Sequence, residues 1–186
     1  MIDKKTSNEF LENGVVLLKQ IIDLSWIIEL QKGIKNNFKN PSKYKCVYEE
    51  HNGDEVFYDD YCNWNRISEY RNFIFKSNIS KIAALLMNSK KVNLFHEHVL
   101  VKEKGSKKRT PWHQDQGYYC VNGKDNVSIW IPLDKVDKYS SMEFIKGSHK
   151  WNKIFLPTKF KGYDYDHKDK EFEKIPDIEN NRDKYE

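Results

Sequence analysis

The hydrophobic period of this chain changes near residue 91, and the change constrains the fold more than any other feature of the sequence. Before it, apolar residues recur at every third or fourth position. After it, they alternate with a period of two, as in residues 92–101. The first period is typical of helices with one buried face, and the second is typical of half-buried strands. Helices followed by strands favour an α+β or mainly β domain, with helices packed on an antiparallel sheet or barrel, over alternating βαβ units.

The first part of the chain, residues 1–90, is expected to be mostly helical. A helix capped by Ser7 should stop at Asn13-Gly14, because glycine readily adopts the left-handed conformation that ends helices. A short apolar run over residues 15–18 predicts a buried strand, whereas residues 42–65 form a polar, aromatic stretch. Three more helices are predicted: from Asp23 or Ser25 to Pro41, over residues 66–76, and from Ser77 or Asn78 onward.

The second part, residues 91–186, is expected to add strands and loops to the same single domain, which spans residues 1–186. Alternation places His96 and His98 on one face of the first strand. Residues 162–186 are polar and have no strand pattern. The predicted strands are residues 92–101, 127–133 and 142–145.

Length and composition exclude several classes of protein. The 186 residues suit one domain, and the 38% hydrophobic content suits a globular core rather than disorder. No apolar run approaches the roughly 20 residues of a membrane span, and the N-terminus has no secretory signal. Three cysteines without C-x-x-C spacing argue against a disulfide scaffold. We therefore expect a cytoplasmic protein with no membrane partner, and the sequence indicates no oligomeric state.

The charge of the chain gives little support for a nucleic-acid partner. The net charge is +4, and all but 4 of the 32 basic residues are lysine, whereas phosphate-reading surfaces favour the planar fork of arginine. One local cluster, Lys102–Arg109, holds five bases and one acid. It is either a solvated hairpin loop or a rim that attracts an anionic small-molecule substrate.

The triplet His113-Gln114-Asp115 has the spacing of two metal ligands. In an extended segment, residues i and i+2 point to the same side. A histidine and a carboxylate are two members of the facial triad that holds non-haem Fe(II) and leaves positions open for a co-substrate and O2. The same spacing occurs in His167-Lys168-Asp169, but that triplet lies in an unpatterned polar stretch and is expected at the surface. The first triplet lies between predicted strands, beside aromatic residues and glycine, as expected at a cavity.

A rival interpretation uses His96, His98 and Glu103, which match part of the metal-binding pattern of cupins. The glycines of that pattern are missing, and strict alternation puts Glu103 on the face opposite the two histidines. The alternative is that His96 and His98 are hydrogen-bonded residues of the sheet.

The stretch from Leu94 to Trp151 resembles the phytanoyl-CoA dioxygenase family of Fe(II)/2-oxoglutarate oxygenases. Weaker similarity at residues 9–14 and 175–178 extends the resemblance over nearly the whole chain. The segments that carry it are Val101-Lys102-Glu103, residues 110–115, residues 127–131, Met142-Glu143-Phe144 and residues 147–151.

This resemblance implies a double-stranded β-helix, which is a jelly-roll barrel, flanked by N-terminal helices. It makes His113 and Asp115 iron ligands. His149, in a Gly-Ser-His turn, is interpreted as structural. The resemblance places His98, Lys102 and Trp130 near 2-oxoglutarate, and Gln116, Tyr118 and Tyr119 are candidate substrate contacts, although packing explains Trp130 and the two tyrosines equally well.

The implied reaction is hydroxylation of a C–H bond in a small organic or acyl substrate, with Fe(II), O2 and 2-oxoglutarate, which becomes succinate and CO2. The family has a third iron ligand, a distal histidine, and an arginine that binds 2-oxoglutarate. Neither is visible here unless His149 or His167 is that ligand. We therefore expect an N-terminal fragment of a longer oxygenase that is itself inactive. The alternative class is a jelly-roll binding module without catalysis.

Overall fold

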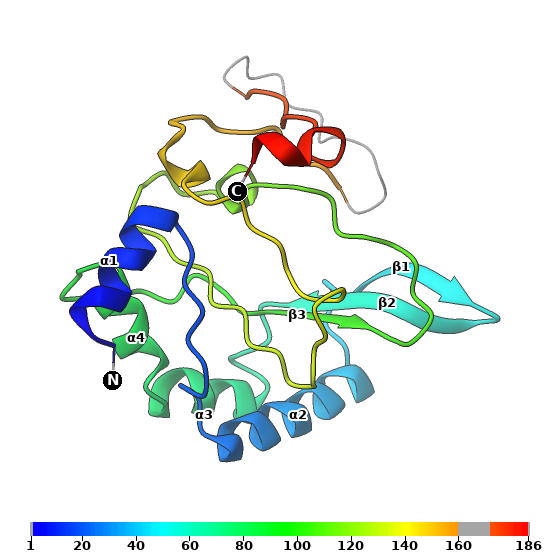
Figure 1. The fold of residues 1–186 in the computed structure, drawn as a ribbon. Coiled ribbons are helices and arrows are strands. Elements are labelled where there is room, and N and C mark those ends of the chain that lie inside the picture. The colour runs from blue at the N-terminus through cyan, green and yellow to red at the C-terminus, as the bar shows by residue number, and fades with distance from the viewer. Residues whose placement is uncertain (1, 160–171, 186) are drawn as a thin grey trace.

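The computed structural model describes residues 2–159 and 172–185 (Figure 1). The described residues form an α+β structure, as the change of hydrophobic period predicts. Its regular elements, in chain order, are α1 (Lys4–Asn13), α2 (Leu24–Lys39), β1 (Cys46–His51), β2 (Asp54–Tyr61), α3 (Ser68–Lys76), α4 (Ile79–Leu86) and β3 (His98–Lys102). Three short 3-10 helices follow: η1 (Asp115–Tyr118), η2 (Ser148–Lys150) and η3 (Glu179–Lys184).

The helices follow the local signals of the sequence closely. Gly14 ends α1 with φ 75°, as predicted, but the cap at its start is Asp3 rather than Ser7, because the Asp3 carboxylate accepts the Thr6 N–H at 2.8 Å. Helix α2 begins directly after Asp23, one of its two predicted starts. The other two helices, α3 and α4, are also confirmed within a few residues.

The sheet has three antiparallel strands in the order β1-β2-β3, so β2 lies in the middle. A tight turn at Asn52-Gly53, with φ 54° and 88°, joins the first two strands. Two consecutive positive φ angles are typical of the hairpin turn that Asn-Gly favours. The sequence analysis described residues 42–65 only as a polar, aromatic stretch, and it therefore missed this hairpin.

A hydrophobic core lies where α2 and α3 pack together, side by side in Figure 1. Gly33 of α2 allows this approach, since a Cβ atom there would lie only 2.6 Å from the Tyr70 ring of α3. The buried residues of this core are Leu30, Ile67, Tyr70 and Phe73, and Val99 of β3 packs against them. The core thus holds the face of the sheet that carries Val99 against the helices.

Most of the predicted strands are wrong. Of residues 92–101 only 98–101 are paired, as part of β3, and residues 15–18, 127–133 and 142–145 are irregular. The described residues therefore contain one three-stranded sheet and not the expected barrel. Residues 127–133 are placed by packing instead: Ile131 and Leu133 lie against the helical core, and Gln31 of α2 donates to the Leu133 carbonyl at 2.7 Å.

The coil after β3 extends to the end of the molecule opposite α2, where η1, η2 and η3 gather (Figure 1). An isolated parallel bridge between Phe155 and Glu173 ties the two described segments together there. None of the helices in residues 2–159 and 172–185 is long and apolar enough to cross a membrane.

Candidate metal centre

His113 and Asp115 lie side by side at the start of η1. His113 Nε2 is 3.4 Å from Asp115 Oδ1. The residue between them, Gln114, has extended backbone (φ −115°, ψ 126°), so the side chains on either side of it point the same way. The sequence analysis predicted this pair on one extended segment. The structure begins a 3-10 turn at Asp115, yet a single extended residue is enough to bring the two side chains together.

Gln114 anchors the pair from the opposite side. Its Nε2 donates to the Lys153 carbonyl at 3.1 Å, and its Oε1 accepts the Phe155 N–H at 3.1 Å. This two-way clamp attaches the triplet to a segment about forty residues further along the chain. The sequence analysis did not identify Gln114, although the middle residue of an H-x-D triplet must point away from the ligand pair.

The ring of His113 is fixed by its second nitrogen. Nδ1 lies 2.8 Å from the Pro111 carbonyl oxygen, which can only accept, so Nδ1 carries the proton. Nε2 is then the nitrogen that faces Asp115. Metal-binding histidines commonly have this arrangement, in which the ring nitrogen that does not bind the metal donates its N–H to a carbonyl. The hydrogen bond to Asp115 raises the pKa of His113. The edge of the Tyr118 ring packs against the imidazole, with ring centroids 5.7 Å apart.

Asp115 is held as an ionised carboxylate. Its Oδ2 accepts the Ser128 hydroxyl and the Tyr119 hydroxyl, the latter at 3.2 Å. The hydrogen bonds from His113 and then Ser128 lower its pKa to about 2, although burial opposes them. Oδ1 therefore remains directed at His113, and the pair offers one nitrogen and one anionic oxygen at a common point.

Tyr119 connects this pair to β3. Its ring lies 4.9 Å from the Phe95 ring and 6.2 Å from the His96 ring, and the ring of His98 lies 6.3 Å from that of His96. His98 has a different polar partner: its Nε2 is 2.7 Å from Oδ2 of the buried Asp59 on β2. The structure thus connects His98 to the site through His96 and Tyr119. His98 is not a member of the candidate metal pair, which consists of His113 and Asp115.

No group of three or more metal-ligand side chains occurs in the described part of the chain. The cupin-type set is not assembled, because His98 binds Asp59 whereas Glu103 lies 3.5 Å from Tyr58 OH. Tyr58 pairs with Val101, on the face of the sheet opposite His98. The interpretation as hydrogen-bonded sheet residues is confirmed for His98. It is wrong for His96, which precedes β3 and contacts the rings of Tyr61, Phe95 and Tyr119.

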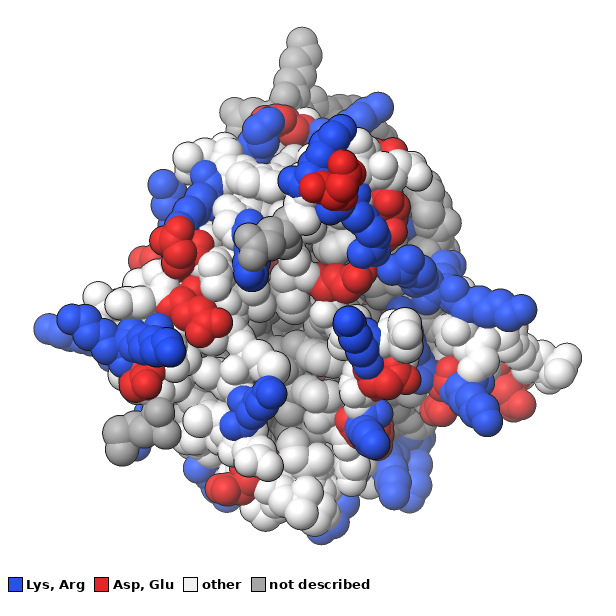
Figure 2. Space-filling view, viewed as in Figure 1, with Lys and Arg blue, Asp and Glu red and all other residues white. Residues whose placement is uncertain are grey.

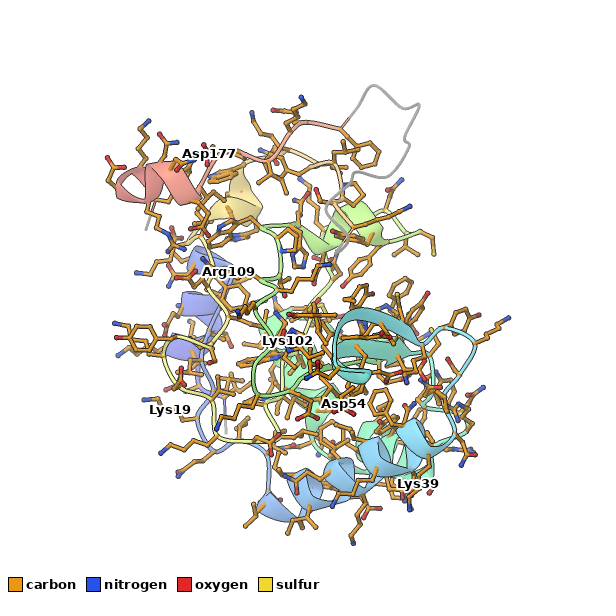
Figure 3. All side chains as sticks on the ribbon, turned by 90° about the vertical axis from the view of Figure 1, so that its right-hand side faces the viewer. Lys19, Lys39, Asp54, Lys102, Arg109 and Asp177 are labelled. Carbon is orange, nitrogen blue, oxygen red and sulfur yellow. The ribbon has the colours of Figure 1, made fainter. Side chains whose placement is uncertain are left out.

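Lys102, labelled in Figure 3, is the last residue of β3. Its Nζ donates to the Lys108 carbonyl and to Thr110 Oγ1, both at 3.1 Å, and lies 4.5 Å from the centroid of the Phe57 ring. Burial lowers the pKa of this amine. Trp130, the other candidate co-substrate contact, is 50% exposed and is not a core residue.

Two of the three candidate substrate residues are engaged in loop contacts. Gln116 donates to the Val121 carbonyl at 2.6 Å and accepts from Asn126 at 2.8 Å. The Tyr118 hydroxyl donates to the Thr158 carbonyl at 2.6 Å. These side chains shape the loops around the metal pair, and Tyr119 binds Asp115 directly.

His149 is placed on α1, as its structural interpretation expects. Its Nε2 lies 3.1 Å from the Leu11 carbonyl oxygen, and its ring packs on Gly14 so closely that a Cβ there would lie 2.3 Å from Nδ1. The Gly147 N–H also donates to the Asn13 carbonyl at 2.8 Å. The second triplet, His167-Lys168-Asp169, lies outside the described residues.

The basic loop Lys102–Arg109 is folded onto β1 by Glu49. The Glu49 carboxylate accepts the Ser106 hydroxyl at 2.7 Å and the N–H groups of Lys107 and Lys108 at 3.2 Å. The Ser106 hydrogen bond, followed by the Lys107 N–H, lowers the pKa of Glu49 to about 2. Arg109 lies 3.5 Å from Glu143. Acidic and basic side chains are interspersed over the face in Figure 2, which shows no broad basic patch there.

Three residues with contacts at this site were not predicted from the sequence: Asp59, Ser128, and Tyr48, whose hydroxyl donates to Asp59 at 2.8 Å. The Asn52-Gly53 turn was the signal that would have identified the β1-β2 hairpin and, with it, the strand that carries Asp59. Ser128 carries no such signal, because its contact with Asp115 is made between two irregular segments.

The comparisons with known proteins agree with the resemblance in the sequence. The family model described as "Phytanoyl-CoA dioxygenase (PhyH)" matches residues 10–186. No curated protein and no solved structure matches the chain.

Proposed function

Because the chain belongs to the phytanoyl-CoA dioxygenase family, we propose that it holds the iron of an Fe(II)- and 2-oxoglutarate-dependent dioxygenase. The observation that carries the proposal is the adjacency of His113 Nε2 and Asp115 Oδ1, 3.4 Å apart. Each of the two groups is also anchored through its other polar atom, to Pro111 and to Ser128.

The donor set fits iron. One imidazole nitrogen and one carboxylate oxygen are two of the three protein ligands in the facial triad of non-haem Fe(II) oxygenases. Bound Fe(II) would supply the activation of O2 that hydroxylates a C–H bond while 2-oxoglutarate becomes succinate and CO2. His113 and Asp115 would hold the metal, and Pro111, Ser128 and Tyr119 would orient them. The third ligand of the triad is not among the described residues.

The family also implies a double-stranded β-helix. In this proposal the sheet β1-β2-β3 is part of one wall of that barrel, and the face with His98 and Lys102 points inward. His98, Lys102 and Trp130 are then the candidate contacts of 2-oxoglutarate. The loop residues Gln116, Tyr118 and Tyr119 border the place of the organic substrate.

The test measures turnover of the co-substrate without a known substrate. In the full-length protein, succinate should form only when Fe(II), O2 and 2-oxoglutarate are all present, and Asp115→Ala should abolish its formation. Asp169→Ala, in the other H-x-D triplet, is the matched control and should retain full turnover.

Two results would contradict the proposal. Full turnover in Asp115→Ala would remove that residue from the iron site. Failure of the iron-loaded protein to bind 2-oxoglutarate in calorimetry would favour a binding module without catalysis.

A further inference from the structure

One face of the sheet carries a column of side chains beside the metal pair. Residues that pair across antiparallel strands share a face. The pairs on this face are Phe57 with Lys102, Asp59 with Leu100, and Tyr61 with His98. Contacts between side chains agree with the register, since Lys102 lies over the Phe57 ring and the rings of Tyr61 and His98 are 5.5 Å apart.

Asp59 is the buried charge in this column. It is 2% exposed, and an ionised carboxylate is costly to bury unless hydrogen bonds compensate. Its Oδ2 accepts the Tyr48 hydroxyl at 2.8 Å and lies 2.7 Å from His98 Nε2. Oδ1 is also buried but has no hydrogen-bond partner among residues 2–159 and 172–185. A carboxylate that served only to hold strands together would be expected to use both oxygens, as Asp60 does on the opposite face.

The contact with Asp59 determines which nitrogen of His98 is protonated. An ionised carboxylate accepts hydrogen bonds and cannot donate them, so His98 Nε2 must carry the proton that lies between them. Nδ1 is then the ring nitrogen left for another partner. The ring is also held in one orientation, with its edge toward Tyr61 and with His96 beside it.

We propose that Asp59 is a positioning residue that acts through His98, holding the imidazole in its Nε2–H form so that Nδ1 faces 2-oxoglutarate. This role rests on the proposed function. The link to the metal pair is Tyr119, whose ring lies 6.2 Å from that of His96 and whose hydroxyl binds Asp115. A side chain that is already ordered before binding loses less entropy when the co-substrate arrives, which strengthens binding.

The first test reads the tautomer directly and needs no activity. NMR of the protein with 15N-labelled histidine should show His98 protonated at Nε2. In Asp59→Asn, the side-chain amide can donate to Nε2, and the Nδ1–H form should appear. Asp60→Asn is the control, because its carboxylate is equally buried but faces α2, and it should leave the His98 signals unchanged. A wild-type His98 protonated at Nδ1, or an Asp59→Asn variant with an unchanged tautomer, would overturn the proposal.

The second test separates positioning from stability. Asp59→Asn should raise the KM for 2-oxoglutarate by about 10-fold and change kcat by less than about two-fold, because a ground-state contact is weakened. In a His98→Gln background the same change should raise KM no further, since coupled residues are not additive. Additive effects would overturn the proposal. A full-length wild-type protein that makes no succinate would contradict the proposed function, while the NMR result would still decide whether Asp59 controls His98.

Discussion

Asp59 and Asp60 are neighbours on β2, both are almost fully buried, and they lie in different surroundings. Asp60 faces α2, where its carboxylate accepts from Asn37 Nδ2 at 2.8 Å, from Ser42 N at 2.8 Å and from Ser42 Oγ at 2.5 Å. Arg66 lies 3.7 Å away. Burial by itself raises the pKa of Asp60, but the hydrogen bonds from Ser42 and its neighbours outweigh it and lower the pKa.

Asp59 faces the side of the sheet where the candidate site lies, and one of its oxygens has no partner among the described residues. On the helix-covered face both oxygens of Asp60 accept hydrogen bonds, although Asn37 Oδ1 and the Tyr70 hydroxyl have no partner among the described residues. On the other face, Asp59 directs only Oδ2 at His98. Burial alone therefore does not distinguish the two carboxylates. They differ in how many of their oxygens accept hydrogen bonds and in the partners that donate them.

The largest expected effect is on metal binding by the candidate site. Asp115→Ala should abolish binding of Mn(II), a redox-inert stand-in for Fe(II), because His113 then remains as a single ligand. The thermal unfolding temperature should change little, since Asp115 contacts surface loops rather than the core. Electron paramagnetic resonance of Mn(II) measures the free ion. Unchanged Mn(II) affinity would place the metal elsewhere.

The next effect is on stability, at the helix-covered face. Asp60→Ala should lower the free energy of unfolding by about 3 kcal/mol, because it leaves the buried Asn37 amide and the Ser42 groups without their acceptor. Urea denaturation followed by circular dichroism measures this loss. Mn(II) affinity in the folded variant should equal that of the wild type. Reduced affinity would show that the two faces are coupled.

A smaller effect is expected at Ser128. Ser128→Ala removes one of the two hydroxyls that fix Asp115 Oδ2, and such outer contacts typically contribute about 10-fold to metal affinity. Mn(II) titration should therefore show affinity about 10-fold weaker than that of the wild type. Ser140→Ala, in an exposed turn where the Ser140 N–H donates to Asp137, is a suitable control. Equal affinities for Ser128→Ala and the control would mean that Tyr119 alone orients the carboxylate.

The smallest effect concerns the basic loop and is a pH dependence. The pKa of Glu49 is lowered from its ordinary value of 4.5 to about 2, so the attachment of the loop is complete above about pH 4.5 and is lost as the pH falls toward 2. Amide hydrogen exchange at Lys107 and Lys108 should report this loss. In Glu49→Gln these amides should exchange faster than in the wild type above about pH 4.5, and the difference should shrink as the pH falls toward 2. Equal protection in that variant would show that the carboxylate does not hold the loop.

The helices and the metal pair could be predicted from the sequence because their causes are local. The end of α1 at Gly14 and the start of α2 at Asp23 depend on the conformations of single residues. The proximity of His113 and Asp115 depends on one extended residue between them. The hairpin was also within reach, since Asn52-Gly53 is a strong turn signal that the aromatic composition of the stretch obscured.

The predicted strand over residues 127–133 failed for a different reason. Its alternating pattern is real, and Ile131 and Leu133 do face the helical core. A strand, however, exists only where a neighbouring backbone pairs with it, and no periodicity in one segment specifies its partner. In the structure, residues 127–133 are held in place by the packing of Ile131 and Leu133 and by the hydrogen bond from Gln31.

By itself, then, the sequence determined the helices, the α+β class, the adjacency of the metal pair and the family. Each of these follows from residues close together in the chain or from a motif of several parts. Only the tertiary structure decided that Ser128 and Tyr119 complete Asp115, that Glu49 holds the basic loop, and that Asp59 holds His98. Those contacts join segments up to 59 residues apart, as between Glu49 and Lys108. Whether these side chains meet depends on how the helices pack on the sheet. That packing involves residues far apart in the chain, so no short stretch of sequence specifies it.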